Sequence, residues 1–532
     1  MKNGKKILFV LLAVLLNAIE VFRNDSSFEV WAVATNLTGL VVLGYILTQV
    51  KVSELCNVFS AIVTVLAVVA CFLSKNIKEV FFATNSIGQI ISGVFNAWWI
   101  IILSVYQLRK MYMEKTLFKG KVGFSFLLWL AASLWAIVGR SEAVWPIWFL
   151  GMFSIFFCTR FSQKDWEDLW TALTASSIWF FVVTEIVFMP FRPYDEVRYV
   201  GFMANPNDFA KYLAIIYLFV LVRLNMLHIA KKPILLKILY VLIGGVNLAM
   251  TFMTGCRTVW IIDIVLTIIF ALGVAWKKWG VGLGKVILGS VLAFLMVIVL
   301  LFPTYFAIRY VPTIHPHPIW FSGEYSESKV HSWDPADSEK YISFSEMLKK
   351  NLGRISEMFF SVLDNSPLLL KAEAAEKEKI VVDMFDDIPG LPQSINARIT
   401  YAEGYISKFN LFGNDSRNTE MYFLSSSGEP IYIWHSQNFW IQITYMFGIP
   451  VGILSFILFI LLFIRSVRVF KSKDNLGINV LPMMFMVFYF IYGLMEVTWL
   501  PGYMIFALIF LVQHPQFKDS FLAEAKENAI NS

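Results

Sequence analysis

The chain has 532 residues, of which 58% are hydrophobic and only 15% are charged, and its mean hydropathy is +0.65. Soluble globular proteins carry about 25% charged residues, so this composition excludes an ordinary soluble protein. The formal net charge of +6 comes from basic residues between apolar segments, a pattern that indicates a membrane orientation and argues against a nucleic-acid-binding protein.

Apolar segments of roughly 18 or more residues recur along almost the whole chain, and each can cross about 30 Å of hydrocarbon as a helix. The short alternating segments of a membrane β-barrel are absent from the sequence. We therefore predict an all-α polytopic membrane protein with about 14 transmembrane helices. The predicted spans are 7–22, 30–50, 56–74, 81–107, 122–139, 143–159, 169–189, 208–222, 238–255, 258–276, 284–302, 438–464, 478–498 and 501–512. The first follows a lysine-rich start without a clear cleavage site, so we expect a retained helix.

The positions of Lys and Arg between the spans predict the orientation. These residues are enriched in cytoplasmic loops, and here they gather in alternate connections along the chain. The basic connections contain Arg109 and Lys110, Arg160 and Lys164, Lys231 and Lys232, Lys277 and Lys278, and Arg465 and Arg468. Both termini are then expected in the cytoplasm, and one large, acidic extracytoplasmic loop is expected between spans 11 and 12.

This orientation divides the chain into five regions. They are the N-terminal transmembrane helices (1–189), transmembrane helices with outward arginine motifs (190–302), the extracytoplasmic loop (303–437), the C-terminal transmembrane helices (438–512) and a cytoplasmic tail (513–532). Within the loop, Ser343–Leu363 has the apolar spacing of an amphipathic helix. Such a helix lies on the membrane, packs over a site or closes a small loop domain, and the sequence leaves these alternatives open.

The first polar cluster on the outer side precedes the eighth span. Arg198 is followed by Gly201 and then by Asn205-Pro206-Asn207. Glycine and asparagine suit a turn, and Asn207 suits a helix cap, so the asparagines have a structural interpretation as well as a functional one. Arg198 lies beside a predicted helix N-terminus, which favours anions, and we expect it to bind one.

The second cluster is the short hinge Cys256-Arg257 between the ninth and tenth spans. A cation near hydrocarbon is costly, by about 2.5–3.5 kcal/mol at mid-depth and less toward the edge. Arg257 therefore either extends to lipid phosphate or binds a diphosphate, whose oxygens match the guanidinium fork. The four cysteines lie in or beside apolar spans, so no disulfide framework is expected.

The third and fourth clusters flank the end of the large loop. Arg398 precedes the turn Leu411-Phe412-Gly413, and by itself this pattern indicates only a loop helix that ends in a glycine turn. His435 and Asn438 then introduce an apolar segment that contains Gly448–Gly452. A histidine titrates near neutrality and can accept a proton from a hydroxyl nucleophile, so His435 is either a general base or an interfacial helix cap.

The sequence offers no cofactor or metal motif. Walker, zinc and dinucleotide-binding patterns are absent. His315 and His317 are separated by proline, which holds the chain extended, and they lack carboxylate or thiol companions nearby. We therefore expect neither a metal nor a cofactor.

In their order along the chain, these clusters resemble the O-antigen ligase and O-antigen polymerase superfamily of bacterial envelope glycan enzymes. The matching segments are Arg198–Asn207, Cys256-Arg257, Arg398 with Leu411-Phe412-Gly413, and His435 with Gly448–Gly452, within about residues 190–465. Two departures stand out. Cys256 replaces the usual serine, and Ser436-Gln437 separate His435 from Asn438, which weakens the transfer of a role to Asn438. The stretch 313–395 has no counterpart in the pattern.

The resemblance implies a membrane glycosyltransferase that transfers a glycan from undecaprenyl diphosphate to an acceptor sugar hydroxyl. It implies that Arg198, Arg257 and Arg398 bind the donor diphosphate without a metal. It implies that His435 is the general base, with Asn205, Asn207 and Asn438 in supporting roles. The site is then on the extracytoplasmic face of the bacterial cytoplasmic membrane.

We expect polymerisation of lipid-linked repeats into a surface polysaccharide such as O-antigen, capsule or exopolysaccharide, because the unmatched loop stretch suits recognition of a repeat. The alternatives are a ligase that transfers the glycan to a terminal acceptor and, in another class, a lipid-linked oligosaccharide flippase or transporter. The expected partners are the lipid-linked glycan, an acceptor glycan and membrane lipids, and no nucleic acid. A flippase and a chain-length regulator are further candidate partners.

Overall fold

The computed structural model describes 124–138, 163–188, 198–199, 201, 206–310, 344–364, 393–414, 419–424, 430–433, 436–472 and 476–496, with four single residues between 58 and 65. The predicted spans 7–22, 30–50, 81–107, 143–159 and 501–512, and most of 56–74, lie outside these residues. His435 and Asn205, which the sequence predicts in the site, also lie outside them, as do His315 and His317.

The regular secondary structure of the described residues is helical except for one pair of short strands in the predicted loop. The helices are α7 (Phe124–Val138), α9 (Gln163–Phe188), α10 (Pro206–Ile229), α11 (Ile234–Thr254), α12 (Arg257–Ile268), the π-helix η1 (Ile269–Trp276), α13 (Leu283–Tyr310), α14 (Phe344–Asp364), α15 (Gln393–Ile406), α16 (Phe439–Phe447), α17 (Ile449–Lys471), the 3₁₀ helix η4 (Ile478–Val480) and α18 (Leu481–Met495). The strands β1 (Thr419–Leu424) and β2 (Pro430–Ile433) pair antiparallel, and the sequence analysis did not predict them.

Six helical segments in the described part of the chain are long and apolar enough to cross a membrane. They are Pro206–Ile229, Ile234–Thr254, Arg257–Trp276, Leu283–Ile308, Ile449–Lys471 and Ile478–Met495. These segments overlap the predicted spans 8 to 13 in order, which confirms a helical membrane protein. A bilayer core offers no water to satisfy backbone polar groups, and a helix satisfies them internally.

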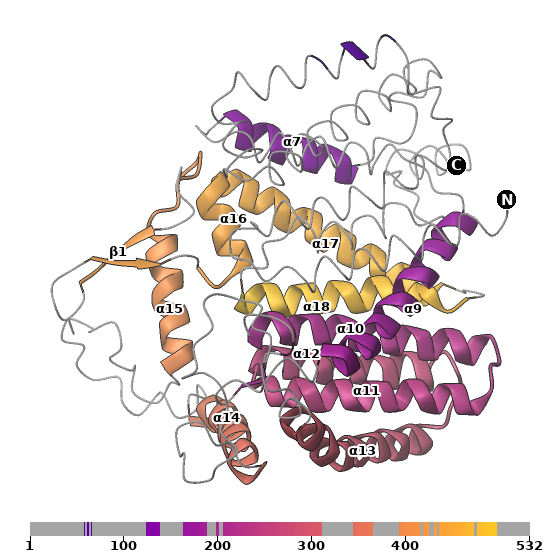
Figure 1. The fold of residues 1–532 in the computed structure, drawn as a ribbon. Coiled ribbons are helices and arrows are strands. Elements are labelled where there is room, and N and C mark those ends of the chain that lie inside the picture. Colours follow the sequence, from indigo (N-terminus) through magenta and orange to yellow (C-terminus); the bar gives the residue numbers. More distant parts are fainter. Residues whose placement is uncertain are drawn as a thin grey trace.

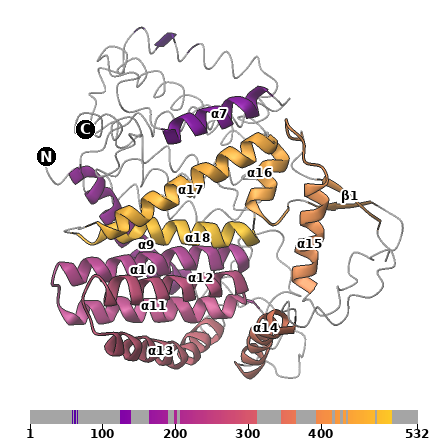
Figure 2. The ribbon, with the colours of Figure 1, turned by 180° about the vertical axis from the view of Figure 1, so that it is seen from behind.

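Figures 1 and 2 show α10, α11 and α12 in the middle of the bundle, with α13 outside α11 and with α17 and α18 on the opposite side. Helix α10 is apolar around its circumference and is the most buried of the candidate spans, whereas α13 is almost entirely exposed. Gly245 allows α11 and α13 to approach closely, because a Cβ there would collide with Leu300 and Met296. The exposed apolar side of α13 is the side expected to face lipid.

The predicted span 438–464 is interrupted at Gly448. The short helix α16 ends there and α17 begins at Ile449, so this single span was predicted wrongly, and α17 continues to Lys471. Gly448 has φ +94°, a conformation that side chains disfavour, and its neighbour Ile449 donates its backbone N–H to Asn410 O at 2.9 Å. The break is therefore built from backbone contacts between two distant segments.

The turn Leu411-Phe412-Gly413 packs against this break. A Cβ on Gly413 would collide with the carbonyl group of Met446, and a Cβ on Gly448 would collide with that of Leu411. Trp135 of α7 stacks on Phe412 with ring centroids 5.5 Å apart and donates Nε1–H to Leu411 O at 2.7 Å. The Leu411-Phe412-Gly413 turn and the Gly448 segment, which in the sequence suggested a functional cluster, thus form a structural junction.

The predicted inner loops meet at the other end of the bundle. Asn225 near the end of α10 donates to Gly477 O at 2.6 Å and accepts a hydrogen bond from Trp279 Nε1 at 2.8 Å. Lys278 lies 4.6 Å from the ring centroid of Phe470 near the end of α17. The basic connections after α10, η1 and α17 therefore share one end, and the arginine motifs described below share the other.

Candidate functional site

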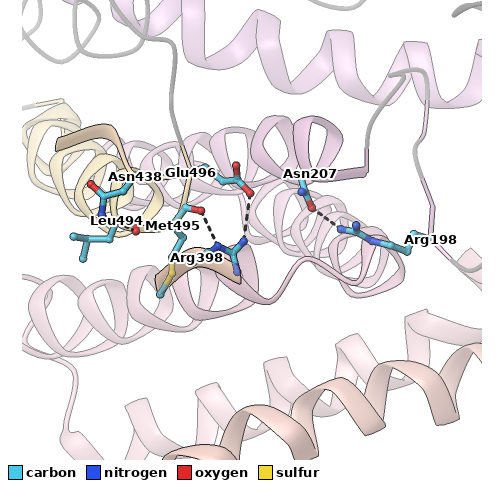
Figure 3. A network of polar contacts seen from close by, with 7 residues as sticks. All are labelled: Arg198, Asn207, Arg398, Asn438, Leu494, Met495 and Glu496. Carbon is cyan, nitrogen blue, oxygen red and sulfur yellow. Dashed lines mark hydrogen bonds and ion pairs between the residues drawn. The ribbon is translucent and has the colours of Figure 1, made fainter. Parts of the chain in front are cut away.

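Arg198 is fixed where the chain approaches α10 and α11. Its Nε donates to Thr254 O at 2.7 Å, and its Nη2 donates to Asn207 Oδ1 at 2.5 Å (Figure 3). The next residue, Tyr199, donates its backbone N–H to Met253 O at 3.0 Å. Asn207 lies in the first turn of α10, so its side chain positions Arg198. The first and second predicted clusters are therefore in direct contact.

The hinge between α11 and α12 places Arg257 next to this group. Gly255 ends α11 in the left-handed conformation, with φ +64°, which glycine adopts without steric cost. Arg257 is the first residue of α12, where the helix dipole is positive, so its own charge is unfavourable there. The positive charge of Arg257 also contributes to lowering the pKa of the Arg198 guanidinium. An anion is the ligand that such a position favours.

A fourth arginine, Arg354, reaches the hinge from the loop helix α14. Arg354 Nη1 donates to Gly255 O at 3.1 Å, and Asn351, one turn earlier, donates to Phe252 O at 3.0 Å. Of the alternatives for Ser343–Leu363, packing over the hinge agrees with the structure. The sequence analysis missed Arg354, although its spacing from Asn351 on one face of an amphipathic helix was a usable signal.

Arg398 and Asn438 meet at the carboxyl end of α18 (Figure 3). Arg398 Nε donates to Met495 O at 3.3 Å, and Arg398 Nη2 lies 3.5 Å from Glu496 Oε1. Asn438 caps α16, because its Oδ1 accepts hydrogen bonds from Trp440 N and Ile441 N, and its Nδ2 donates to Leu494 O at 3.1 Å. The third and fourth clusters thus both contact the end of α18. The sequence predicted this helix but not its contact with the two clusters.

Among the described residues, the positively charged side chains of the site outnumber the negatively charged ones. Its basic side chains are Arg198, Arg257, Arg354, Arg398 and Lys211, and its acidic side chains are Asp208 and Glu496. Burial lowers the pKa of the Arg198 guanidinium, and the charges of Arg354 and Arg257 act in the same direction. Burial also raises the pKa of the Glu496 carboxyl, which the charge of Arg398 opposes. Glu496 was not predicted as a site residue, because it lies within the predicted span 478–498 and belongs to no recognisable motif.

The residues that follow His435 form a tight entry into α16. Ser436 is buried, its backbone N–H donates to Gln442 Oε1 at 2.8 Å, and its Oγ donates to Asn438 O at 2.7 Å. Gln437 has φ +51°. Ser436-Gln437, which separate His435 from Asn438 in the sequence, are therefore a turn that keeps Asn438 at the helix start. Within the described residues, no group of three or more His, Cys, Asp or Glu could hold a metal ion.

Comparison with known proteins gave no match: no protein-family model, no curated protein and no solved structure is similar to this chain.

Replacing Asn438 with alanine is expected to destabilise the protein by about 1 kcal/mol, because the cap of α16 is lost. Asn438→Asp keeps the acceptor for Trp440 N and Ile441 N and places a negative charge at the positive helix end, so it should retain most of the stability. Thermal unfolding of both variants in detergent measures the difference. Equal midpoints for Asn438→Ala and the wild type would exclude the capping role.

Proposed function

We propose that this chain is a membrane glycosyltransferase that polymerises undecaprenyl-diphosphate-linked oligosaccharide repeats into a surface polysaccharide. The observation that supports this proposal is the convergence of Arg198, Arg257, Arg354 and Arg398 from four separate segments at one end of the bundle. Like charges held close together repel each other, and a bound diphosphate would relieve this repulsion. Guanidinium groups also match phosphate oxygens in a bidentate manner.

The arginines act on the leaving group. When the acceptor hydroxyl attacks the anomeric carbon, the bond from that carbon to the diphosphate oxygen breaks, and negative charge accumulates on the diphosphate. Fixed cations stabilise this charge without reorganisation. The Nε and Nη2 groups of Arg198 are held by Thr254 and Asn207, which orients its Nη1 donors. The cationic site would perform the role that a divalent metal performs in other transferases.

His435 is the proposed general base. It would accept the proton of the acceptor hydroxyl as the new glycosidic bond forms, and direct attack inverts the configuration at the anomeric carbon. His435 is three residues from Asn438, whose side chain shares the end of α18 with Arg398. This separation is short enough to bring the base near the arginines. Asn205 and Asn207 support Arg198 in this proposal.

We also propose that the site lies on the extracytoplasmic face of the bacterial cytoplasmic membrane, in a protein of about 14 spans. The positive-inside rule assigns the Lys- and Arg-rich connections after α10, η1 and α17 to the cytoplasm. In the structure these connections lie at the end of the bundle opposite to the arginine site. The assignment follows from the rule, and the common location of the connections supports it.

Purified full-length protein, supplied with the lipid-linked repeat as both donor and acceptor, should produce a ladder of elongated glycans. His435→Gln should lower the transfer rate by at least about 10²-fold, because the amide cannot accept the proton. The transfer rate of the wild type should also decrease when the pH is lowered below about 6–7, because histidine becomes protonated there. Lys232→Ala, at an exposed position on the opposite end, is the matched control.

Near-wild-type transfer by His435→Gln would restrict His435 to a structural role. Transfer only to a terminal acceptor, without a ladder, would identify a ligase. Movement of the lipid-linked glycan across the bilayer without a new glycosidic bond would identify a flippase.

A further inference from the structure

Arg223 lies near the end of α10 that is opposite to the arginine site, and its guanidinium has almost no polar partner. Its Nε is buried without a hydrogen-bond partner among the described residues, and its Nη1 makes only a weak contact, 3.8 Å from Met226 Sδ. The guanidinium carbon lies 5.9 Å from the ring centroid of Tyr240 on α11. A cation held in this way at the edge of an apolar bundle is costly, and such residues commonly serve a function.

The hairpin of α10 and α11 offers no carboxylate to neutralise this arginine. The sequence from 209 to 262, which includes all of α11 and all but the first three residues of α10, contains neither Asp nor Glu. Within the described part of the chain, no ion pair is formed by the four basic residues at this end of the hairpin, which are Arg223, Lys231, Lys232 and Lys237. Their charge therefore favours an anion from outside the hairpin.

The turn between α10 and α11 contains a lysine where glycine is usual. Lys232 donates its backbone N–H to Leu227 O, and Lys231 donates its own to His228 O, both at 3.0 Å, which is the pattern of a Schellman cap. The residue with left-handed backbone in this motif is usually glycine, but here it is Lys231, with φ +49°. A side chain at a position that disfavours one indicates a function for its charge.

Lys237 and Tyr240 lie on one face of α11 and face the last turns of α10. They are three positions apart, so they are neighbours along the helix. Tyr240 contacts Arg223, and the charge of Lys237 acts on His228 in the last turn of α10. Two cations from the two helices therefore lie on either side of the Tyr240 ring position. Trp179 of α9, which is 43% exposed, packs edge-on against Tyr240 with ring centroids 6.3 Å apart.

The outer side of α11 distinguishes a lipid from a soluble anion. Leu235, Leu239 and Leu242 are exposed and recur about once per turn from the hairpin toward the middle of the bundle. A phospholipid fits both features, because its phosphate can meet the cations while its acyl chains lie along the leucines. Trp and Tyr side chains are also typical of the level at which lipid headgroups lie. A soluble anion would leave the apolar surface unused.

We propose that the hairpin of α10 and α11 binds the phosphate of an anionic phospholipid through Arg223 and Lys237, below the turn at Lys231. A guanidinium on an aromatic ring keeps its in-plane donors available for phosphate oxygens. Basic pockets between membrane helices bind anionic headgroups in this way. The positive-inside rule assigns this end of the bundle to the cytoplasmic leaflet. The site is separate from the proposed glycan transfer and does not depend on it.

Native mass spectrometry of the purified full-length protein tests the proposal, in detergent with equal amounts of phosphatidylglycerol and phosphatidylcholine that have identical acyl chains. The wild type should retain phosphatidylglycerol preferentially. Arg223→Gln should weaken this retention by about tenfold or more, because the fork for phosphate is lost, and Lys237→Gln should weaken it by about fivefold. Lys285→Gln, which removes an exposed lysine of α13 at the same end of the bundle, should behave like the wild type.

Thermal unfolding of the wild type provides a measurement that requires no variant. Phosphatidylglycerol should raise the midpoint above that in phosphatidylcholine, because a ligand that binds the folded state stabilises it. Equal retention of the two lipids by the wild type, or unchanged retention by Arg223→Gln, would overturn the proposal. An equal loss in Arg223→Gln and Lys285→Gln would also overturn it, since overall charge alone would then attract the lipid. So would an equal rise of the midpoint with inorganic phosphate, which would identify a site for a soluble anion.

Discussion

Arg257→Ala is expected to lower the rate of glycan transfer by about 10²–10³-fold, because one fixed cation is lost from the leaving diphosphate. The variant should still fold, since a positive charge at the N-terminus of α12 opposes the helix dipole. The measurement is the initial rate with purified protein and the lipid-linked repeat, alongside a thermal unfolding curve.

Two further variants sharpen this result. Arg257→Lys keeps the charge but loses the planar fork, so its rate should fall between those of the wild type and Arg257→Ala. Arg354→Ala should also reduce transfer, because Arg354 lies on the same hinge through Gly255. Full activity in Arg257→Ala would remove this residue from donor binding and would favour the alternative in which it extends to lipid phosphate.

Gly448→Ala is expected to prevent stable folding, with a cost of more than about 3 kcal/mol from overpacking together with a left-handed backbone. At φ +94° a side chain is strained, and its Cβ would collide with the carbonyl group of Leu411. That carbonyl accepts the Trp135 Nε1 hydrogen bond, so moving it away would also disrupt the contact with α7. The yield of monodisperse protein in size-exclusion chromatography and the unfolding midpoint measure the loss.

Gly289→Ala in α13 is the matched control. A Cβ at Gly289 would meet no atom within 4 Å, and alanine is a better helix former than glycine by up to about 1 kcal/mol. This variant should therefore fold as well as the wild type or better. If Gly448→Ala matched Gly289→Ala in yield and midpoint, the junction between α16 and the Leu411–Gly413 turn would not be essential for folding.

The helical membrane class could be predicted from the sequence because the length of an apolar segment is a local property. The helices from α10 to α13 lie where spans 8 to 11 were expected. The hinge at Gly255 could also be predicted, because a glycine stands where one apolar segment ends and the next begins. Arg257 could be selected because a cation beside an apolar segment is costly, and Arg198 because it precedes a predicted helix N-terminus, whereas Arg398 was selected only through the resemblance. The count of about 14 spans and the roles of Asn205 and His435 stay predictions.

The contacts between these residues depended on the tertiary structure. Arg354 is 99 positions from Gly255, and Arg398 is 97 positions from Met495, so no local pattern relates them. The break at Gly448 was hidden within an apolar segment because its cause is the distant turn at Leu411. Local composition determines which segments enter the membrane, whereas long-range packing decides which polar groups meet there.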